Sequence, residues 1–500
     1  MRPASLTRTR IGSLSAGRAP QRAAWYAYGV NRPAPLEAAA PAVLERGSRR
    51  GRLMLIGVTL GSGIAILDGS VVNVALRSIG EDLDASLAQL QWVVNGYLLA
   101  LASLVLVGGA LGDRLGRRRV YLVGVTWFMV ASGLCALAQT PGQLVALRVL
   151  QGVGAALLTP GALSLIQASF TAKDRAPAIG TWAGFSGIAA AVGPILGGWI
   201  VDTTTWRWIF AINVPLCLGV LALTWYAAPE SRDPDHSGRF DVPGAGLTVV
   251  SLGALTYALT ATTEAPAGVV ALAYAVAVAA AAAFLVRERR TAHPLVPLGL
   301  FRSRVFSAAN GMTLLVYGAL GGVSLFTVLQ LQAAGWSALE AGLSGLPMTI
   351  ALLLLSSRAA ALSARIGPRI PMTLGPLICS AGTLLLLAVG LDATWLDVLP
   401  GMTVFALGLA LLVSPLTAAV LDAAPDRVAG VASGVNNAVA RAGSLLAVAA
   451  LPALVGLAGD EYLDPAAMTS GYRGAMLWCA ALLAAGGVIS WFGLGRAERR

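Results

Sequence analysis

Residues 109–119 read Gly-Ala-Leu-Gly-Asp-Arg-Leu-Gly-Arg-Arg-Arg and separate two long apolar runs, residues 90–111 and 119–138. A helix needs about 20 apolar residues to cross the hydrocarbon core of a bilayer, and each run reaches that length. Charged side chains are costly at membrane depth, so the aspartate and arginines must lie in water. In a tight turn Asp113 could cap a helix N-terminus and pair with an arginine. The stretch therefore predicts a cytoplasmic turn between two membrane-spanning helices, although a plain solvated loop could have the same composition.

The composition of the whole chain is typical of a membrane protein. Of the 500 residues, 57% are hydrophobic and 12% are charged, about half of the roughly 25% found in soluble domains. Intrinsic disorder requires low hydrophobicity, and a soluble enzyme requires more polar surface than this chain can supply. The bulk of the chain therefore fits neither a disordered protein nor a soluble enzyme.

Fourteen apolar runs are long enough to cross a bilayer. Their bounds are 53–75, 90–111, 119–138, 143–166, 176–200, 206–227, 243–262, 266–286, 304–329, 340–361, 369–390, 395–420, 428–456 and 472–493. Strands of a membrane barrel would be about 10 residues long with alternating polarity. The sequence therefore predicts an all-α integral membrane protein with 14 transmembrane helices.

The basic residues gather on one side of this topology. An even number of spans places both termini on the same side. If that side is the cytoplasm, the opposite loops hold only Arg77, Arg207 and Arg473 among the basic residues, together with acidic clusters at 81–84 and 460–464. Because Lys and Arg accumulate in cytoplasmic loops, we predict a multi-pass protein of the plasma (inner) membrane of a bacterium-like cell, with both termini cytoplasmic. The net charge of +11 then reflects topology, and no nucleic-acid partner is expected.

A weak internal repeat indicates a duplicated bundle. The pattern of residues 111–118 recurs at 362–369, with Ala364 in the place of Asp113, and duplicated bundles are common in transporters. We predict a disordered Arg/Pro/Ala-rich cytoplasmic tail (1–50), an N-terminal six-helix bundle (51–228), two extra spanning helices with linkers (229–303), a C-terminal six-helix bundle (304–493) and a cytoplasmic tail (494–500). The first tail could instead be an import signal, or translation could start near Met54.

Three charges interrupt the apolar runs. Asp68 lies in the first run, Arg148 in the fourth and Arg441 in the thirteenth, while Gln151 and Asn437 lie one helical turn from the two arginines. A lone carboxylate on a spanning helix can load and release a proton, and an arginine within reach can control that protonation. Each could instead be a paired or snorkelling residue that only holds helices together.

The sequence offers no obvious metal or cofactor site. The four cysteines, Cys135, Cys217, Cys379 and Cys479, are spread over separate apolar runs and fit buried packing thiols. The two histidines, His236 and His293, lie in polar stretches and form no cluster with cysteine. We expect no cofactor and no metal.

Four segments, taken in order, resemble the major facilitator superfamily and specifically its fourteen-span drug:proton antiporters. The turn resembles the signature loop of the superfamily, through Gly109, Asp113, Arg114, Gly116, Arg117 and Arg118. Residues 67–76 resemble the group's motif in helix 1, with Ser70 for the usual Thr, and Arg77 replaces the usual Pro next to it. Residues 144–156, with Arg148, Gln151 and Gly152, resemble the motif in helix 4. Helix 5 resembles the antiporter motif through Gly180, Gly193, Pro194, Gly197 and Gly198, with Ala189 where Gly is usual.

This resemblance covers residues 53–493 and implies two pseudo-symmetric six-helix bundles around a central cavity, with two inserted helices. It implies proton coupling through Asp68 and Arg148 and a gating role for the turn. The helix 5 motif implies antiport. The proline and glycines of this motif also predict a bend and close packing in helix 5. We expect a monomeric exporter of small, lipophilic, often cationic compounds. Candidate cavity residues are Asn73, Asn95, Tyr97, Trp182, Asn310, Tyr317, Asn436, Asn437 and Arg441.

Other functions remain open from the sequence. A proton-coupled symporter that imports a metabolite, or a sensor paralogue without transport, would have a similar sequence. A membrane enzyme would need catalytic groups on large loops, and a channel would need a filter loop or a charged ring; neither feature is visible.

Overall fold

The computed structural model describes residues 44–232, 241–291, 294–425 and 428–494. In these ranges the chain is helical, and its only β-type pairing is an isolated bridge between Leu44 and Phe170. Residues 1–43 and 495–500, which belong to the two predicted tails, lie outside the described residues. The loop residues His236 and His293 lie outside them as well.

All fourteen apolar runs form helices. The first six runs form α1 (Arg49–Leu83), α2 (Leu87–Leu115), α3 (Arg117–Cys135), α4 (Pro141–Ser169), α5 (Ala172–Thr203), and the consecutive pair α6 (Trp208–Ala211) and α7 (Asn213–Ala227). The two inserted helices are α8 (Val242–Thr260) and α9 (Ala267–Arg290), joined by the short η2 (Ala261–Thr263). After η3 (Leu298–Arg302), the last six runs form α10 (Arg304–Ala333), the pair α11 (Ala338–Leu343) and α12 (Leu346–Ile366), α13 (Arg369–Leu385) with η4 (Leu386–Ala388), α14 (Trp395–Asp422), α15 (Ala429–Leu454) and, after η6 (Glu461–Leu463), α16 (Pro465–Gly493).

Thirteen helical segments of the described ranges are long and apolar enough to cross a membrane, one fewer than the sequence predicts. The exception is α3, which has 19 residues and begins with Arg117, Arg118 and Arg119. These three charges shorten its apolar part. The segment α3 still packs along α4 and α7 as a member of the bundle.

Local sequence explains where the helices begin. Ser86 and Gln89 form a capping box at the start of α2, and Ser337 and Glu340 form another at α11. The side chain of Thr140 caps α4, which has a proline in its first turn, where its missing N–H is harmless. These polar groups satisfy N–H groups that have no partner inside the helix.

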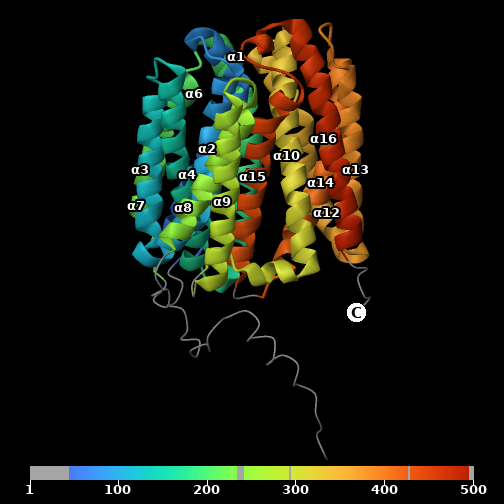
Figure 1. Ribbon diagram of the computed structural model, residues 1–500. Helices are drawn as coiled ribbons and strands as arrows, with labels where there is room; N and C mark the ends of the chain where they lie inside the picture. The colour runs from blue at the N-terminus through green and yellow to red at the C-terminus, as the bar shows by residue number, and fades with distance from the viewer. Residues whose placement is uncertain (1–43, 233–240, 292–293, 426–427, 495–500) are drawn as a thin grey trace, which may run out of the picture. The chain divides into compact units, whose positions relative to one another are not determined.

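The helices form two groups and an inserted pair. Figure 1 shows α1–α7 on the left and α10–α16 on the right, with α8 and α9 in front and α15 near the centre. The helix α8 packs on α9, on α2 and on α15, so the inserted pair covers the contact between the two groups. We call α1–α7 the first half and α10–α16 the second half.

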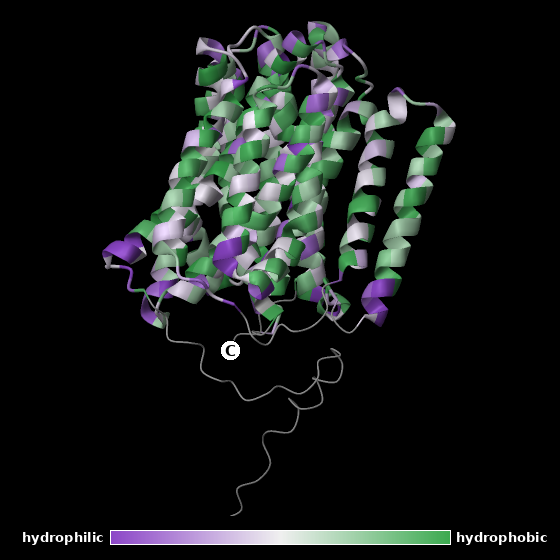
Figure 2. Cartoon of the chain, turned by 90° about the vertical axis from the view of Figure 1, so that its left-hand side faces the viewer, coloured by the Kyte–Doolittle hydropathy of each residue, from purple (hydrophilic) through white to green (hydrophobic). Residues whose placement is uncertain are grey.

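Most of the charged residues lie toward the two ends of the helices, where Figure 2 shows hydrophilic stretches in purple. We call the end where α1 begins the basic end, and it includes Arg114, Arg117, Arg118, Arg119, Arg287, Arg289, Arg290, Arg365 and Arg369. We call the opposite end the acidic end, and it includes Glu81, Asp82, Asp84, Asp460, Glu461 and Asp464. Apolar helix lies between the two ends.

The predicted repeat corresponds to a repeated turn. Gly116 ends α2 with a φ of 113°, and Gly367 ends α12 with a φ of 84°. Side chains with a Cβ rarely adopt these angles. Each glycine therefore allows the same reversal at the same place in its half.

The first predicted tail ends earlier than residue 50. Ser48 caps α1, which begins at Arg49. Leu44 is 5% exposed, and its backbone N–H donates to the carbonyl of Ser169 (3.1 Å). A single leucine between alanines and arginines carries no periodic signal, which is why the sequence did not predict that residues 44–50 belong to the folded part.

Candidate functional site

A buried ion pair joins α1 and α4. Asp68 is 0% exposed and Arg148 is 1% exposed, and their Oδ2 and NH1 atoms are 2.5 Å apart. Asp68 lies 19 residues from the start of α1 and 15 from its end (68 − 49 and 83 − 68), far from both ends of its helix. Arg148 lies seven residues from the start of α4 (148 − 141) and is removed from water by the side chains around it. The sequence named both residues but could not show that they touch.

Two amides complete the shell around the carboxylate. Gln151 Nε2 and Asn213 Nδ2 both donate to Asp68 Oδ1, at 2.8 and 3.0 Å. Arg148 also donates to Gln151 Oε1 (2.7 Å), and Asn213 also donates to the hydroxyl of Ser132 (3.0 Å). Both carboxylate oxygens therefore accept hydrogen bonds, from three donors in total. Such bonds offset the large cost of removing an ion pair from water.

The guanidinium of Arg148 is held on all sides. Its Nε donates to the carbonyl of Val93 (3.1 Å). Its carbon lies 4.4 Å from the ring centre of Tyr97 and 5.6 Å from that of Phe210, within the range of cation–π attraction. The Tyr97 hydroxyl in turn donates to the carbonyl of Ala65 in α1 (3.0 Å). Arg148 is therefore a positioned counter-charge, and too deeply placed to snorkel.

Sequence reasoning missed Asn213 and Ser132. Asn213 is a fully buried amide inside the apolar run 206–227, which is a signal that the sequence did contain. Ser132 is also fully buried, and its hydroxyl donates to the carbonyl of Phe210 (2.9 Å). Small hydroxyls are common in membrane helices, so its sequence gives no such signal.

Gly152 brings α4 close to α2. A Cβ added there would lie 2.6 Å from the carbonyl oxygen of Tyr97. A larger residue would push apart the helices that carry Arg148 and Tyr97. The glycine of the helix 4 motif thus sets the spacing of the cluster.

The predicted turn at the basic end contains a second ion pair. Asp113 Oδ1 is 2.8 Å from both Nε and NH2 of Arg117, across the junction of α2 and α3. Gly109 faces Pro160 of α4, and Arg114 is partly exposed. Pairing of Asp113 with an arginine agrees with the sequence prediction.

Capping in this turn comes from a residue that the sequence did not predict. Glu230 accepts from the backbone N–H groups of Arg118 (3.1 Å) and Arg119 (3.2 Å) at the start of α3. The Arg118 side chain donates to the carbonyl of Ala228 (3.1 Å). A Cβ on Gly116 would lie 2.7 Å from a Glu230 carboxylate oxygen. The capping role expected for Asp113 therefore belongs to Glu230, over 100 residues along the chain.

The helix 5 motif packs on both halves. A Cβ on Gly193 or Gly197 would collide with side chains of α1, and one on Gly198 would collide with the backbone of α11. Gly180 has open space around it. The helix α5 continues without a break through Pro194. The close packing predicted from these glycines is present at three of the four positions.

A smaller polar cluster lies in the second half. Asn436 of α15 donates to Asn310 Oδ1 (3.2 Å) and to the Thr313 hydroxyl (2.8 Å) of α10. Of the other candidate cavity residues, Asn95 and Tyr97 are buried, Asn73, Trp182, Tyr317 and Arg441 are partly exposed, and Asn437 is exposed. Trp182 donates to the Ser62 hydroxyl (2.9 Å). Both amide atoms of the fully buried Asn95 lack a partner.

Within the described ranges, every hydrogen bond between the two halves lies near the acidic end. Arg77 NH1 donates to the carbonyl of Gln332 (2.6 Å), whose own amide donates to the carbonyl of Val74 (2.8 Å). Gln91 Nε2 donates to the carbonyl of Val448 (2.6 Å). The hydrogen bonds between the two halves are therefore confined to one end, although α2 and α15 also pack against each other elsewhere.

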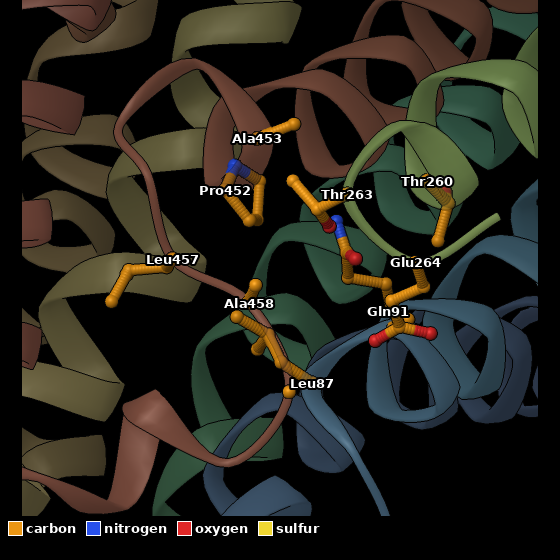
Figure 3. Close-up of a pocket in the computed structure, with 11 residues that line it drawn as sticks. Leu87, Gln91, Thr260, Thr263, Glu264, Pro452, Ala453, Leu457 and Ala458 are labelled. Carbon is orange, nitrogen blue, oxygen red and sulfur yellow. The ribbon is translucent and has the colours of Figure 1, made fainter. Parts of the chain in front are cut away.

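The inserted pair of helices also lies at this junction between the halves at the acidic end. Figure 3 shows Gln91 of α2, Glu264 after η2 and Pro452 of α15 around one small cavity of about 10 Å³. A space of this size holds about one water molecule. The ends of α2, α8 and α15 thus meet closely at the acidic end.

Asp202 makes a further contact between the two halves at the acidic end, and its contribution can be tested. Its carboxylate, at the end of α5, accepts from the backbone N–H groups of Ala338 (3.0 Å) and Leu339 (2.9 Å), the first residues of α11. Caps of this kind contribute about 0.5–2 kcal/mol. Asp202→Ala is expected to raise the fraction of molecules open at the acidic end several-fold.

Spin labels on Thr205→Cys and Ala466→Cys, one in each half, measure that opening as a longer distance between the labels. Asp392→Ala removes another exposed acid of the same end and serves as the control. If both alanine variants give the same distance distribution as the parent, Asp202 does not stabilise the closed end.

No group of three or more His, Cys, Asp or Glu suited to a metal ion occurs in the described ranges. All four cysteines are buried.

Two helical halves with hydrogen bonds between them at one end, thirteen candidate spans and an ion pair buried within the first half are typical of a multi-spanning membrane transporter. The sequence model of the Major Facilitator Superfamily matches residues 58–448, so the chain belongs to that family. It is a family of transporters and not of enzymes.

Relatives with known roles are resistance proteins. The chain is 36% identical to the methylenomycin A resistance protein of Streptomyces coelicolor, over 89% of this chain and 93% of that protein. It is 35% identical to the tetracenomycin C resistance and export protein of Streptomyces glaucescens, over 82% and 77% of the two chains. It is also 35% identical to the multidrug resistance protein Stp of Mycobacterium tuberculosis, over 83% and 77%.

Solved structures of transporters share the fold. A crystal structure of a D-xylose–proton symporter has a TM-score of 0.64 at 15% identity and covers 90% of this chain and 99% of its own. A POT family transporter in complex with a thioalcohol-conjugated peptide has a TM-score of 0.66 at 14% identity, with 90% and 97% covered. At these identities the likeness concerns the fold alone.

Proposed function

We propose that this protein exports small organic compounds, antibiotics or other drugs among them, in exchange for protons. The observation that carries the proposal is the buried Asp68–Arg148 pair, in which a single carboxylate at membrane depth has a matched counter-charge. Resistance and export proteins among the relatives support the direction of transport. One chain contains both halves and the complete cluster, so we propose that the monomer is the working unit.

The distribution of charge supports an orientation in the membrane. Basic residues collect at the end where α1 begins and where α16 ends, and acidic residues collect at the other. By the preference of Lys and Arg for the cytoplasm, the basic end faces the cytoplasm of a bacterial cell and the acidic end faces outward. The described state, in which hydrogen bonds join the halves only at the acidic end, then corresponds to an inward-facing transporter.

The hydrogen bonds around Asp68 connect protonation with conformation. The Asp68 carboxylate accepts hydrogen bonds from three donors, Arg148, Gln151 and Asn213. Adding a proton would neutralise Asp68 and remove the attraction that holds Arg148. At 0% exposure Asp68 cannot exchange a proton with water in this state. We therefore assign this state to the molecule after proton release, and we assign proton uptake to a state open at the acidic end.

A proton gradient supplies sufficient energy for this cycle. One charge that moves across 100 mV releases about 2.3 kcal/mol, and a pH difference adds to it. The halves would rock about the cluster between the two states. Inward proton movement on Asp68 would then drive outward movement of the cargo.

A growth screen and a flux measurement test this function. Cells that express the protein are grown against a panel of antibiotics, and the compound to which they become resistant is taken as the cargo. Proteoliposomes filled with a pH-sensitive dye then receive a gradient of that compound. Antiport moves protons against the direction of the cargo, symport moves them with it, and a sensor moves neither. Proton movement in the direction of the cargo would overturn the proposal.

Asn213 offers a test of the hydrogen bonds that hold Asp68. Asn213→Leu removes one of the three donors to the buried carboxylate. Hydrogen bonds to charged groups contribute about 1.5–3 kcal/mol, and about 1.4 kcal/mol corresponds to a factor of ten. The rate of proton-driven export is therefore expected to fall at least about ten-fold.

Ser132→Ala is the matched control, because it leaves the contact between Asn213 and Asp68 in place. Its loss of export should be clearly smaller. Equal export by Asn213→Leu and Ser132→Ala would mean that the hydrogen bond from Asn213 to Asp68 does not support transport.

A further inference from the structure

Arg441 is a charge at the centre of a membrane-spanning helix. It lies 12 residues from the start of α15 and 13 from its end (441 − 429 and 454 − 441). At 1.5 Å per residue both ends are about 18–20 Å away, well beyond the reach of an arginine side chain. Snorkelling therefore does not bring this charge to either aqueous end.

Arg441 differs from Arg148 in having no partner in the protein. Within residues 44–494, masked positions aside, Arg441 makes no hydrogen bond, ion pair or ring contact, whereas Arg148 has all three. An unpaired charge at the bilayer centre costs at least about 2.5–3.5 kcal/mol. Charges in such places pair with one another or face a functional pathway.

The two neighbours of α15 show where Arg441 points. Ser444 of α15 donates to the carbonyl of Tyr317 in α10 (2.9 Å), so this side faces the second half. A Cβ on Gly434 would lie 2.7 Å from a methyl group of Leu106 in α2, so that side faces the first half. The sector between these two sides faces the boundary between the halves.

Helical geometry places Asn437 and Arg441 in that sector. With 3.6 residues per turn, Asn437, Arg441 and Gly434 lie about 20°, 60° and 80° around the axis from Ser444. Asn437 is exposed and Arg441 is partly exposed, in agreement with this direction. Asn437 also makes no hydrogen bond in the described ranges. A cation and an amide, one turn apart, are thus both available to a ligand.

Two tyrosines connect this place with the Asp68 cluster. The charge of Arg441 acts electrostatically on the phenol groups of both Tyr97 and Tyr317. The ring of Tyr97 also contacts Arg148, the partner of Asp68. Arg441 is therefore close enough to the Asp68 cluster for its charge to act on Tyr97.

We propose that Arg441 binds an anionic group, such as a carboxylate, on the exported compound, with Asn437 and Tyr317 as additional hydrogen-bond donors. A planar guanidinium binds a carboxylate through two parallel hydrogen bonds, which suits an otherwise unpaired arginine. This inference rests on the proposed export function and specifies its cargo as acidic organic molecules. It replaces the expectation of cationic cargo from the sequence, since the one unpaired charge at mid-membrane in the described ranges is positive.

Three probes with one ring system test the charge preference. Purified full-length protein in lipid nanodiscs at pH 7 is titrated by calorimetry with 2-naphthylacetate, its neutral amide, and 2-naphthylmethyl-trimethylammonium. The wild type is expected to bind the anion at least about ten-fold more tightly than the amide, as charge-assisted hydrogen bonds permit. Arg441→Gln should remove that preference and leave the amide affinity within about two-fold. Arg441→Lys should keep part of the preference.

Arg473→Gln removes the same charge from an exposed position on α16 and is the matched control. It should leave all three affinities unchanged. The proposal is overturned if the wild type does not bind the anion more tightly than the amide, or if Arg441→Gln weakens all three probes equally. These outcomes do not depend on proton flux, so failure of the anion site and failure of proton-coupled export are distinguishable.

Discussion

Asp68→Asn is expected to abolish resistance and proton-driven export while the protein still folds and binds its cargo. Asparagine has nearly the same shape but carries no charge and cannot take up a proton. Its amide nitrogen would also face donors, since Arg148, Gln151 and Asn213 all donate to this position. Export at an imposed pH gradient should fall at least about 100-fold, to the level of cells without the protein, as expected for loss of the coupling group.

The control for this variant is Asp422→Asn, which removes an exposed carboxylate at the basic end of α14. It should export at close to the wild-type rate. Cargo binding to purified Asp68→Asn, measured by calorimetry, should stay within a few-fold of wild type. If Asp68→Asn still confers full resistance, Asp68 is not the coupling carboxylate.

Arg148→Met is expected to destabilise the protein as well as to stop transport. It leaves the fully buried Asp68 without its counter-charge, and removing one partner of a buried ion pair costs about 3–5 kcal/mol. It also removes the hydrogen bond to Val93 and the contacts with the rings of Tyr97 and Phe210. The melting temperature in detergent should fall by several degrees, and export should reach background.

The double variant Asp68→Asn/Arg148→Met shows whether Arg148→Met is destabilised by the unpaired carboxylate or by lost packing. It has no unpaired carboxylate, so it should recover much of the lost stability and none of the transport. If Arg148→Met melts at the wild-type temperature, the ion pair does not stabilise the buried carboxylate. If the double variant is no more stable than Arg148→Met, the destabilisation comes from packing alone.

The fold could be predicted from the sequence because it depends on local signals. Apolar length predicted all fourteen helices, and the turn with Asp113 and Gly116 marked the junction that Gly367 repeats in the second half. The helix termini differ by several residues from the bounds of the apolar runs. The helix α16, for example, begins at Pro465, before its apolar run starts. Burial in lipid makes hydrophobic length an unusually direct guide to structure.

The site could be predicted only in part, since its contacts join distant helices. Asp68 and Arg148 were visible as charges in apolar runs, but their contact spans 80 residues. Glu230 caps α3 from a segment that carries no motif. Asp202 binds backbone groups of α11, a contact that the sequence does not reveal. Arg441 was visible as a charge in an apolar run, but its lack of a partner in the described ranges could not be predicted.

Proton flux in everted vesicles shows whether cargo leaves in exchange for protons carried by Asp68. Vesicles from cells with wild-type protein or with Asp68→Asn are acidified inside by respiration and followed with a pH-sensitive dye. Addition of the cargo compound found by the growth screen should dissipate the pH gradient in wild-type vesicles and leave it unchanged in Asp68→Asn vesicles. Equal dissipation in both would contradict the claim.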